Sequence, residues 1–337
     1  MPESKKEKSG TNSERLLRVL EILRETDEEH PITAQKIVEK LENVYFITAE
    51  KKAVCRDIAS LNSCGYSIEL SDDNKLGWYY VHEFEDWQLK VMTDAVLAAR
   101  FLDNSSASDL AKKIMGLGSN AGRKMLSLMN VPSEARLGER SVKYGIDTVL
   151  NAIKGHKKLI FNYHHLNEEG VKVPKHSSPA VPVSPYRLIW QDDKYYLIAS
   201  YKEKELSYYR LDRMEDIRIL DEKALPLSEL LGSDEEHKLK EFIKLNIYSK
   251  KGPSVRLELR LLKGGADAVY DTFGSNAQII RGRDGIVSAY ITVSESEGLY
   301  SWLMQHALDV TVVSPEGVRE EMRKRLEEAL SRHSRLT

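Results

Sequence analysis

The spacing of apolar residues changes several times along this chain, and each change predicts a different kind of domain. Helical spacing dominates up to about residue 64, a short alternating stretch follows, and helical spacing returns between residues 85 and 150. Strand-like segments then occupy residues 157–220, and the last part mixes both patterns. A chain of 337 residues with this pattern is expected to fold as an α+β protein of several domains.

The first 82 residues carry the pattern of a small helical domain that ends in a hairpin. Apolar residues at helical spacing predict a first helix after a flexible arm at residues 1–12, and a second helix that Thr33 can cap. A third helix is expected from about Thr48 to Cys64, with Gly65 at a left-handed terminus. Two alternating stretches, residues 66–70 and 78–81, predict a β-hairpin. This order over residues 13–82 is typical of a winged helix-turn-helix, whose third helix enters the major groove of DNA.

Candidate DNA contacts lie on the exposed side of the third helix. Basic side chains there can neutralise phosphates, and a helix N-terminus itself favours an anion. Charge alone does not support this, because residues 1–80 hold 12 Lys and Arg against 15 Asp and Glu, a net charge of −3. The same side chains equally fit the solvated face of a surface helix. The fold pattern therefore carries the DNA hypothesis, with candidate contacts at Thr48, Lys51, Lys52, Cys55 and Arg56 and supporting charges at Lys5, Lys6 and Lys8 of the arm.

The rest of the chain divides into a connector, a strand-rich domain and a mixed domain. Residues 83–150 keep helical spacing and predict a helical connector. Five short strand segments predict a small β-barrel domain over residues 151–225. A charged linker helix at residues 226–253 leads to the last domain, residues 254–337, whose segments follow the order β-α-β-β-α-β before a final helix. That order is typical of a ferredoxin-like fold.

The strand-rich segment is unusually aromatic. Seven aromatic residues fall between Tyr186 and Tyr209, where the chain average of 8% would place about two. Such rings can stack on nucleobases at roughly 1–3 kcal/mol each, and Arg187, Arg210 and Arg213 supply planar cations for phosphates. Strands also favour Tyr and Trp for packing, and the arginines could pair with neighbouring acids on the surface. The pattern by itself leaves both interpretations open. Because 50 Lys and Arg nearly balance 52 Asp and Glu over the whole chain, any polyanion site must be local.

Local motifs in the first third of the chain resemble a known family. Residues 51–58, Lys-Lys-Ala-Val-Cys-Arg-Asp-Ile, followed by Leu61 and Gly65-Tyr66, resemble the recognition helix of bacterial winged-helix regulators that carry a WYL effector domain. Residues 82–102 are similar to the connector of such proteins. The sequence departs from the family at Ala53, where threonine is usual, and at Cys55, where a larger residue is common.

The resemblance covers nearly the whole chain. Residues 184–188, 194–199 and 209–214 are similar to the three most recognisable stretches of a WYL domain, which is an Sm-like β-barrel. The eponymous Trp-Tyr-Leu is Tyr195-Tyr196-Leu197 here, which keeps an aromatic ring at the first position. The helix at residues 298–303, the turn at Pro315 and the final helix resemble the C-terminal extension of the family.

The resemblance implies a DNA-binding transcriptional regulator whose WYL domain senses a nucleotide or single-stranded nucleic-acid ligand and thereby alters operator binding. Two reading heads would match a palindromic site, so a homodimer on double-stranded operator DNA is expected. The alternative is a nucleic-acid-binding accessory protein of a defence system, which holds single strands without controlling a promoter. The resemblance places the effector pocket at Ser184, Tyr186, Tyr196, Arg210 and Arg213, and further candidates are Arg187 and Tyr163.

Other classes of protein find no support in the sequence. It holds no visible nucleophile–base pair, Walker sequence or His-Glu-x-x-His motif, so no enzymatic activity is expected. His164 and His165 would point to opposite faces of a strand, and neither a metal nor a cofactor is predicted. Cys55 and Cys64 are nine positions apart, too distant on one helix for a disulfide. The first residues lack the apolar core of a signal peptide and no membrane span is evident, so a cytoplasmic protein without membrane contact is expected.

Overall fold

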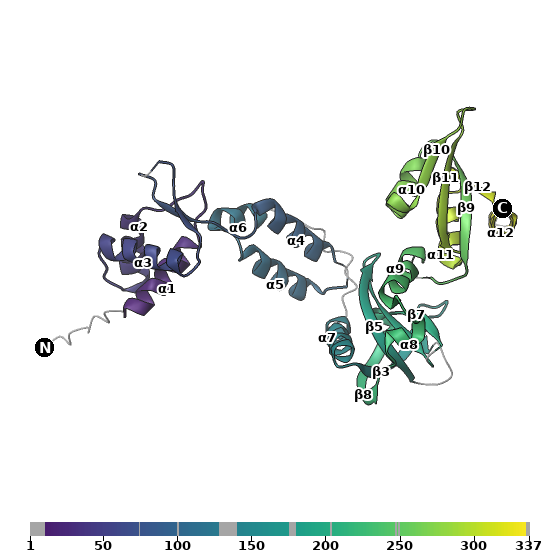
Figure 1. Cartoon of the computed structure of the whole chain (residues 1–337), viewed down its shortest axis with the longest axis horizontal. Coiled ribbons are helices and arrows are strands. Elements are labelled where there is room, and N and C mark those ends of the chain that lie inside the picture. Colours follow the sequence, from purple (N-terminus) through teal and green to yellow (C-terminus); the bar gives the residue numbers. More distant parts are fainter. Residues whose placement is uncertain are drawn as a thin grey trace. The chain divides into compact units, whose positions relative to one another are not determined.

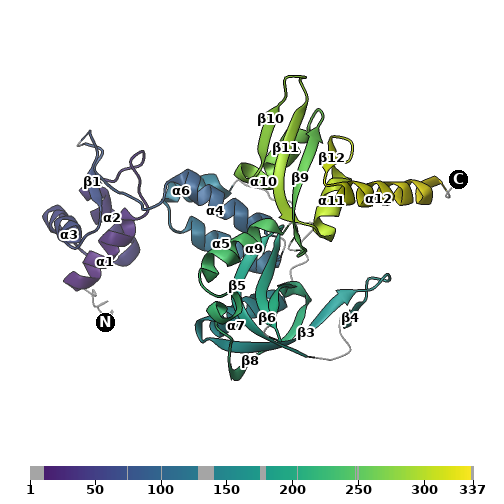
Figure 2. The same ribbon diagram turned by 45° about the vertical axis from the view of Figure 1, so that its right-hand side comes forward.

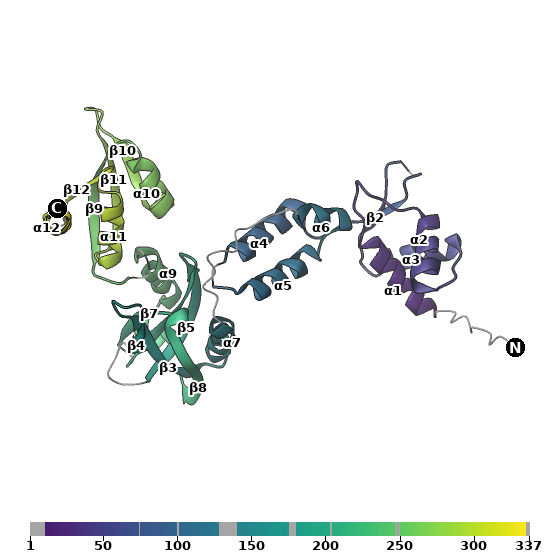
Figure 3. The ribbon, with the colours of Figure 1, turned by 180° about the vertical axis from the view of Figure 1, so that it is seen from behind.

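The structure is a computed structural model of the chain and describes residues 11–73, 75–99, 101–127, 140–174, 180–202, 204–246, 248 and 250–334. The chain divides into two compact units, residues 1–138 and 139–337. Figures 1 and 3 show the elements of each unit from opposite sides. In its described part, the first unit holds helices and a two-stranded sheet, and the second holds two larger sheets with covering helices.

Three short helices begin the first unit: α1 (Asn12–Leu23), α2 (Ala34–Tyr45) and α3 (Lys51–Ser63). The side chain of Thr33 accepts a hydrogen bond from the amide of Lys36 at 3.3 Å, which confirms the predicted cap of α2. Gly65 has φ +92°, the left-handed conformation that was predicted there. α3 begins at Lys51 and not near Thr48, because the chain must first turn to bury Ile47 in the core between the three helices.

A small hairpin completes this core. β1 (Ile68–Leu70) pairs with β2 (Trp78–Tyr80) in antiparallel fashion, and Trp78 also exchanges two backbone hydrogen bonds of 2.8 Å with Ile32. Gly77 allows this close approach, since it has φ +101° and a Cβ atom there would lie 2.1 Å from the carbonyl oxygen of Ile32. The hairpin is thereby fixed against the segment between α1 and α2.

The connector of the first unit consists of α4 (Asp86–Ala98), α5 (Asn104–Met115) and α6 (Asn120–Ser127). It is joined to the three-helix core by a junction of backbone groups. The ring nitrogens of His82 lie 2.9 Å from the carbonyl oxygen of Thr26 and 3.1 Å from that of Leu117. The amide of Asn120 donates to the carbonyl oxygen of Glu25 at 3.0 Å. The connector is therefore held against the three-helix core by hydrogen bonds and is not attached through a free linker.

The second unit begins with α7 (Arg140–Lys154), which packs on a six-stranded sheet. Strands β5, β6 and β7 are neighbours in chain order, and β3 pairs with β4, β5 and β8, so the sheet curls into a half-barrel (Figure 2). All these pairs are antiparallel. The five predicted strand segments lie in five of the strands, whereas β4 was not predicted. The strands are β3 (Lys157–Leu166), β4 (Lys172–Pro174), β5 (Val181–Gln191), β6 (Lys194–Tyr201), β7 (Glu205–Arg210) and β8 (Met214–Lys223).

The charged segment after the half-barrel was predicted as one helix, but it forms two, α8 (Leu227–Leu231) and α9 (Glu235–Leu245). Gly232 separates them with φ +74° and ψ −158°, a conformation that a helix cannot contain. Leu239 of α9 is buried with Ile198 and Leu206 of the sheet, and this contact holds the two helices beside β6 and β7.

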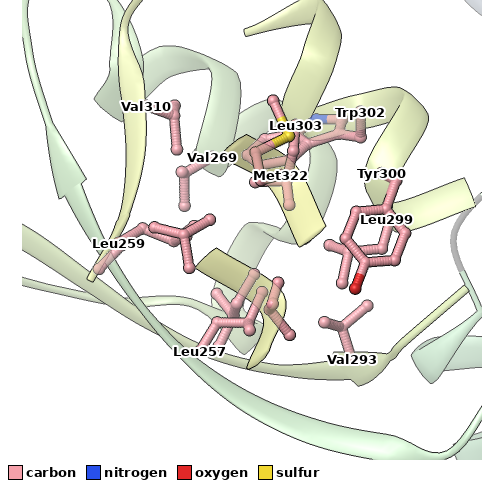
Figure 4. Packing of buried hydrophobic residues seen from close by; sticks show 14 of the residues in the cluster. Leu257, Leu259, Val269, Val293, Leu299, Tyr300, Trp302, Leu303, Val310 and Met322 are labelled. Carbon is pink, nitrogen blue, oxygen red and sulfur yellow. The ribbon is translucent and has the colours of Figure 1, made fainter. Parts of the chain in front are cut away.

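The last part of the chain follows the predicted order β-α-β-β-α-β and final helix. Its four strands form an antiparallel sheet in the order β10-β11-β9-β12. Buried residues of the sheet and of the two helices between the strands form one core around Trp302, Leu259 and Val293 (Figure 4). The elements are β9 (Ser254–Leu261), α10 (Gly265–Phe273), β10 (Gln278–Arg281), β11 (Val287–Ser294), α11 (Glu297–Gln305), β12 (Val310–Ser314) and α12 (Glu316–Ser334).

Candidate functional site

Residues of β3, β6, β7 and the segment after α9 line a hollow of about 740 Å³, which we call the tyrosine hollow. This volume lies within the range of about 300–1,000 Å³ that is usual for small-molecule sites. Cations outnumber acids in the lining by six to one, so the hollow suits an anionic ligand with flat rings. The lining consists of Tyr163, Tyr196, Tyr201, Tyr208, Tyr209, Tyr248, Lys202, Lys204, Arg210, Arg213, Lys250, Lys251, Glu205 and Ser207.

The buried tyrosines are held rigid by ring contacts. The rings of Tyr163 and Tyr209 are nearly perpendicular with centroids 5.4 Å apart, and both rings also meet Phe161 edge to face. Burial raises the pKa of Tyr209 to about 12 and also raises the pKa of Tyr163 and of Tyr196. These phenols therefore stay neutral at physiological pH and present uncharged aromatic surfaces to the hollow.

Arg210 is oriented by two neighbours. Its backbone N–H donates to the hydroxyl oxygen of Tyr163 at 3.0 Å, and its guanidinium donates two hydrogen bonds of 3.1 and 2.6 Å to Asp212. Burial by itself would raise the pKa of Asp212, but the Arg210 guanidinium lowers that pKa below its ordinary value. The carboxylate thus stays charged and holds the guanidinium in place. An anionic ligand must share Arg210 with Asp212.

Most other cations of the hollow lack a carboxylate partner among the described residues. Within the described part of the chain, Arg213, Lys202 and Lys204 form no ion pair with a carboxylate. Lys251 pairs with Glu205 at the edge of the hollow and lies 3.4 Å from the hydroxyl of Ser207. Guanidinium and ammonium groups that lack a carboxylate partner are available for phosphate oxygens.

The three other predicted effector residues do not line the tyrosine hollow. The hydroxyl of Ser184 is buried and accepts a hydrogen bond from the amide of Leu225 at 2.9 Å. Tyr186 packs beneath α8 and α9, and its hydroxyl lies 3.2 Å from that of Ser200. Arg187 is exposed and binds Glu236 of α9 at 2.7 and 2.9 Å. These contacts give all three side chains a structural role in this arrangement.

Several lining residues were not predicted from the sequence. Lys202 and Lys204 lie in the turn between β6 and β7, and Lys250 and Lys251 follow α9. The four lysines fall in two places that are far apart in the sequence, and only the folded chain brings them to one hollow. Tyr248 precedes the second pair and was a usable signal, since a tyrosine close to two lysines is a composition typical of single-strand binding surfaces.

The structure places the five predicted DNA contacts together on α3 and on the turn before it. Lys51, Lys52, Cys55 and Arg56 are exposed on the helix, and Thr48 is exposed three residues before its start. The arm residues Lys5, Lys6 and Lys8 lie outside the described residues. Both cysteines are free thiols on the surface.

The inner side of α3 is fixed by an ion pair. Asp57 accepts two hydrogen bonds from the guanidinium of Arg15 on α1, at 2.7 and 3.1 Å. The two side chains are only 11% and 17% exposed. This brace sets the rotation of α3 about its axis, and it therefore determines which side chains face outwards.

Two kinds of feature are absent from the described residues. No cluster of three or more His, Cys, Asp or Glu side chains in this part of the chain is arranged to bind a metal ion. Within the same residues, no helix has both the length and the apolar composition needed to cross a membrane.

Comparison with known proteins identifies two domains. Residues 145–219, which include the curled sheet and most of the lining of the tyrosine hollow, match the model of the WYL domain. The chain carries a WYL domain. Residues 253–330 match the WCX domain and cover the sheet of β9 to β12. The two matches confirm the resemblance that the sequence motifs indicated. No curated protein matches the chain.

Two solved structures are similar to this WYL-domain protein at low identity. Proteasome accessory factor B/C (PafBC) of Arthrobacter aurescens is 17% identical, with a TM-score of 0.29. The match covers 98% of this chain but 50% of PafBC, so the chain spans half the length of that protein. A CRISPR Cas-related protein is 14% identical, with a TM-score of 0.39, and the match covers 91% of this chain and 94% of that protein.

In this WYL domain the name-giving motif serves two purposes. Leu197 is fully buried in the core of the sheet. The ring of Tyr196 contacts the ring of Tyr208 edge to face and lines the tyrosine hollow. Tyr195, in place of the usual tryptophan, lies opposite Trp190 on β5. The motif therefore connects the core of the domain to its candidate ligand site.

Proposed function

We propose that this WYL-domain protein is a DNA-binding transcriptional regulator whose tyrosine hollow senses a nucleotide or a single-stranded nucleic acid and thereby alters operator binding. The observation that carries this proposal is the lining of the hollow, with six tyrosines and six cations against one acid. Neutral rings can stack on bases of any sequence, while lysines and arginines neutralise phosphates. A protein whose formal net charge is −2 has no general attraction for nucleic acid, so this local excess of cations is informative.

The first 82 residues supply the proposed reading head. Three helices and a hairpin support a winged helix-turn-helix, in which α3 enters the major groove with Lys52 and Arg56 facing the DNA. The tip of the hairpin carries Asp72 and Asp73, both exposed, and carboxylates there would repel phosphates. The phosphate contacts of this head are therefore assigned to α3 and not to the hairpin.

Regulation requires that the ligand bind one state of the protein better than another, because only differential affinity shifts an equilibrium. The ion pairs of Arg210 with Asp212 and of Lys251 with Glu205 offer this difference. A phosphate that takes either cation releases a carboxylate, and Lys251 belongs to the segment that leads into the WCX domain. The order of strands in that domain supports a ferredoxin-like fold, and we assign it a role in the response or in dimerisation.

The proposal also covers the oligomeric state and the cellular location of the protein. We assign it a homodimer that reads a palindromic operator, because two heads spaced by about one helical turn match such a site. It acts by binding and not by catalysis, and it works in the cytoplasm, where operator DNA is found.

The test begins with selection of duplexes from a random pool by the full chain. Fluorescence anisotropy then measures the affinity of the selected duplex with and without a short single-stranded oligodeoxythymidine. The proposal expects a selected motif, a shift in duplex affinity with the oligomer, and loss of that shift in Arg213→Ala. The double variant Lys52→Ala, Arg56→Ala should weaken duplex binding and flatten its salt dependence.

The outcomes separate the two functions considered for the chain. Failure to enrich any duplex motif, together with tight binding of single strands, would contradict the regulator and favour the accessory protein that only holds single strands. Duplex binding that no oligomer or nucleotide alters would contradict the sensing role of the hollow. A mass of one chain in solution, both free and on the selected duplex, would contradict the homodimer.

A further inference from the structure

A second hollow adjoins the tyrosine hollow. Its volume is about 620 Å³, and its lining residues come from β7, α8, α9 and the segment after α9. We call it the leucine hollow, because Leu206, Leu230, Leu231 and Leu245 line it together with Phe242. The two hollows share three lining residues, Lys204, Glu205 and Lys251, so they are continuous at that edge.

Two stacked rings form the partition between the hollows. Tyr208 lines the tyrosine hollow and Phe242 lines the leucine hollow. The two rings are nearly parallel, with centroids 4.9 Å apart and an interplanar angle of 13°. The hydroxyl of Tyr208 donates to the carbonyl oxygen of Phe242 at 3.2 Å, which keeps β7 and α9 in register at this point. A flat group on either side would extend the stack of rings.

Charge is concentrated where the two hollows meet. Lys204 forms no ion pair with a carboxylate of the described residues, and Lys251 pairs with Glu205. A third lysine, Lys238 of α9, lines the leucine hollow and donates to the carbonyl oxygen of Leu231 at 2.7 Å. An anion between the hollows would meet two ammonium groups and would compete with Glu205 for Lys251, while Glu241 also lines the leucine hollow. Groups on either side of the anion would meet rings and leucines.

We propose that the leucine hollow is a second base site for the ligand of the tyrosine hollow. The effector is then a single strand of at least two nucleotides. Its bases lie on opposite sides of the Tyr208–Phe242 pair, and the phosphate between them lies on Lys204 and Lys251. This inference rests on the proposed function, since it requires that the tyrosine hollow bind a nucleotide. A mononucleotide would fill one hollow and leave the other without a ligand.

The test compares ligands that differ by one nucleotide. Isothermal titration calorimetry with the full chain measures the affinity of thymidine 5′-monophosphate, of the 5′-phosphorylated dithymidylate, and of the same dimer without its second base. One added base–aromatic stack should tighten binding by about 5- to 100-fold, and the dimer lacking that base should lose most of this gain.

Two variants test whether Phe242 provides the gain in affinity from monomer to dimer. Phe242→Leu keeps an apolar side chain and removes the ring, so the ratio of dimer to monomer affinity should fall towards one. The matched control is Phe273→Leu in the WCX domain, whose ring contacts Trp302 and lies in neither hollow. It should keep the wild-type ratio. Thermal melting of both variants shows whether each retains the folded domain.

Three results would overturn the inference. Equal affinity for monomer and dimer would exclude the second base site while leaving the proposed sensing of a nucleotide intact. A dimer without its second base that binds as tightly as the intact dimer would assign the gain to the phosphate alone. A wild-type ratio in Phe242→Leu would place the second base elsewhere. Failure of all three ligands to bind, by contrast, would contradict the proposed function itself.

Discussion

Replacing Asp57 by alanine should loosen α3 without changing the side chains on its exposed face. Asp57 holds Arg15 through two hydrogen bonds, and the two side chains are only 11% and 17% exposed. Breaking a buried ion pair costs about 3–5 kcal/mol, whereas an exposed pair is worth about 0.2–1 kcal/mol. Because some water reaches this pair, we expect a loss of about 2 kcal/mol in the local stability of α3, roughly a 30-fold change in its opening equilibrium.

Hydrogen exchange followed by mass spectrometry measures this change in the full chain. Amides of α1 and α3 should exchange about 30-fold faster in Asp57→Ala, since exchange through local opening follows the opening equilibrium. The matched control is Glu21→Ala, which removes an exposed ion pair between Glu21 and Arg18, both on α1. It should change the exchange rate of these amides by less than about threefold. Equal exchange rates of the α3 amides in the two variants would show that the Arg15–Asp57 ion pair does not stabilise α3. A charge swap, Arg15→Asp with Asp57→Arg, should recover part of the protection.

Three further predictions concern the hairpin, the phenols and the arginines. Gly77→Ala should detach the hairpin, because its Cβ atom would lie 2.1 Å from the carbonyl oxygen of Ile32; faster hydrogen exchange at Trp78 would show this, and unchanged protection would contradict it. The raised pKa of Tyr209, about 12, means that the neutral phenol is favoured in the folded state. Its contribution to stability is complete below pH 10 and is lost as the pH rises from 10 to 12, so chemical denaturation of Tyr209→Phe should show a weaker loss over that window than the wild type. Arg213→Ala should weaken binding of oligodeoxythymidine by about 10-fold or more, whereas Arg187→Ala should change it by less than about twofold, because Arg187 pairs with Glu236 outside the tyrosine hollow. Equal effects of the two arginine variants would contradict the placement of the site.

Local signals in the sequence were sufficient to predict most of the helices and strands. The cap at Thr33 and the left-handed Gly65 follow from side-chain chemistry and backbone sterics, which act within a few residues. The order of strands and helices in the WCX domain was also visible, because its hairpin turn and alternating strands are short-range features. The short strand β4 was missed, since only pairing with β3 makes three residues into a strand.

The candidate site was only partly predictable, and β5 shows why. Alternation along a regular strand would assign neighbouring side chains to opposite faces, but β5 has a bulge between Pro185 and Arg187. The extra residue shifts the pairing, and Tyr186 packs beneath α8 and α9. Proline at this point cannot donate a ladder hydrogen bond, which fits the irregularity. By contrast, Arg210 precedes and Arg213 ends a tight 3-10 turn, η1 (Leu211–Arg213), and both line the hollow in which the family resemblance placed them.

The backbone junction between the head and its connector sets a rule for building chimeras. Carbonyl and amide groups of Glu25, Thr26, Leu117 and Asn120 join the two parts, so a graft cut at residue 82 would leave His82 and these groups facing a foreign surface. A graft of this part of the chain should therefore span residues 11–127 as one cassette. Because these four groups are main-chain atoms and only His82 contributes a side chain, substitutions elsewhere in such a cassette would leave the junction between its two halves largely unchanged.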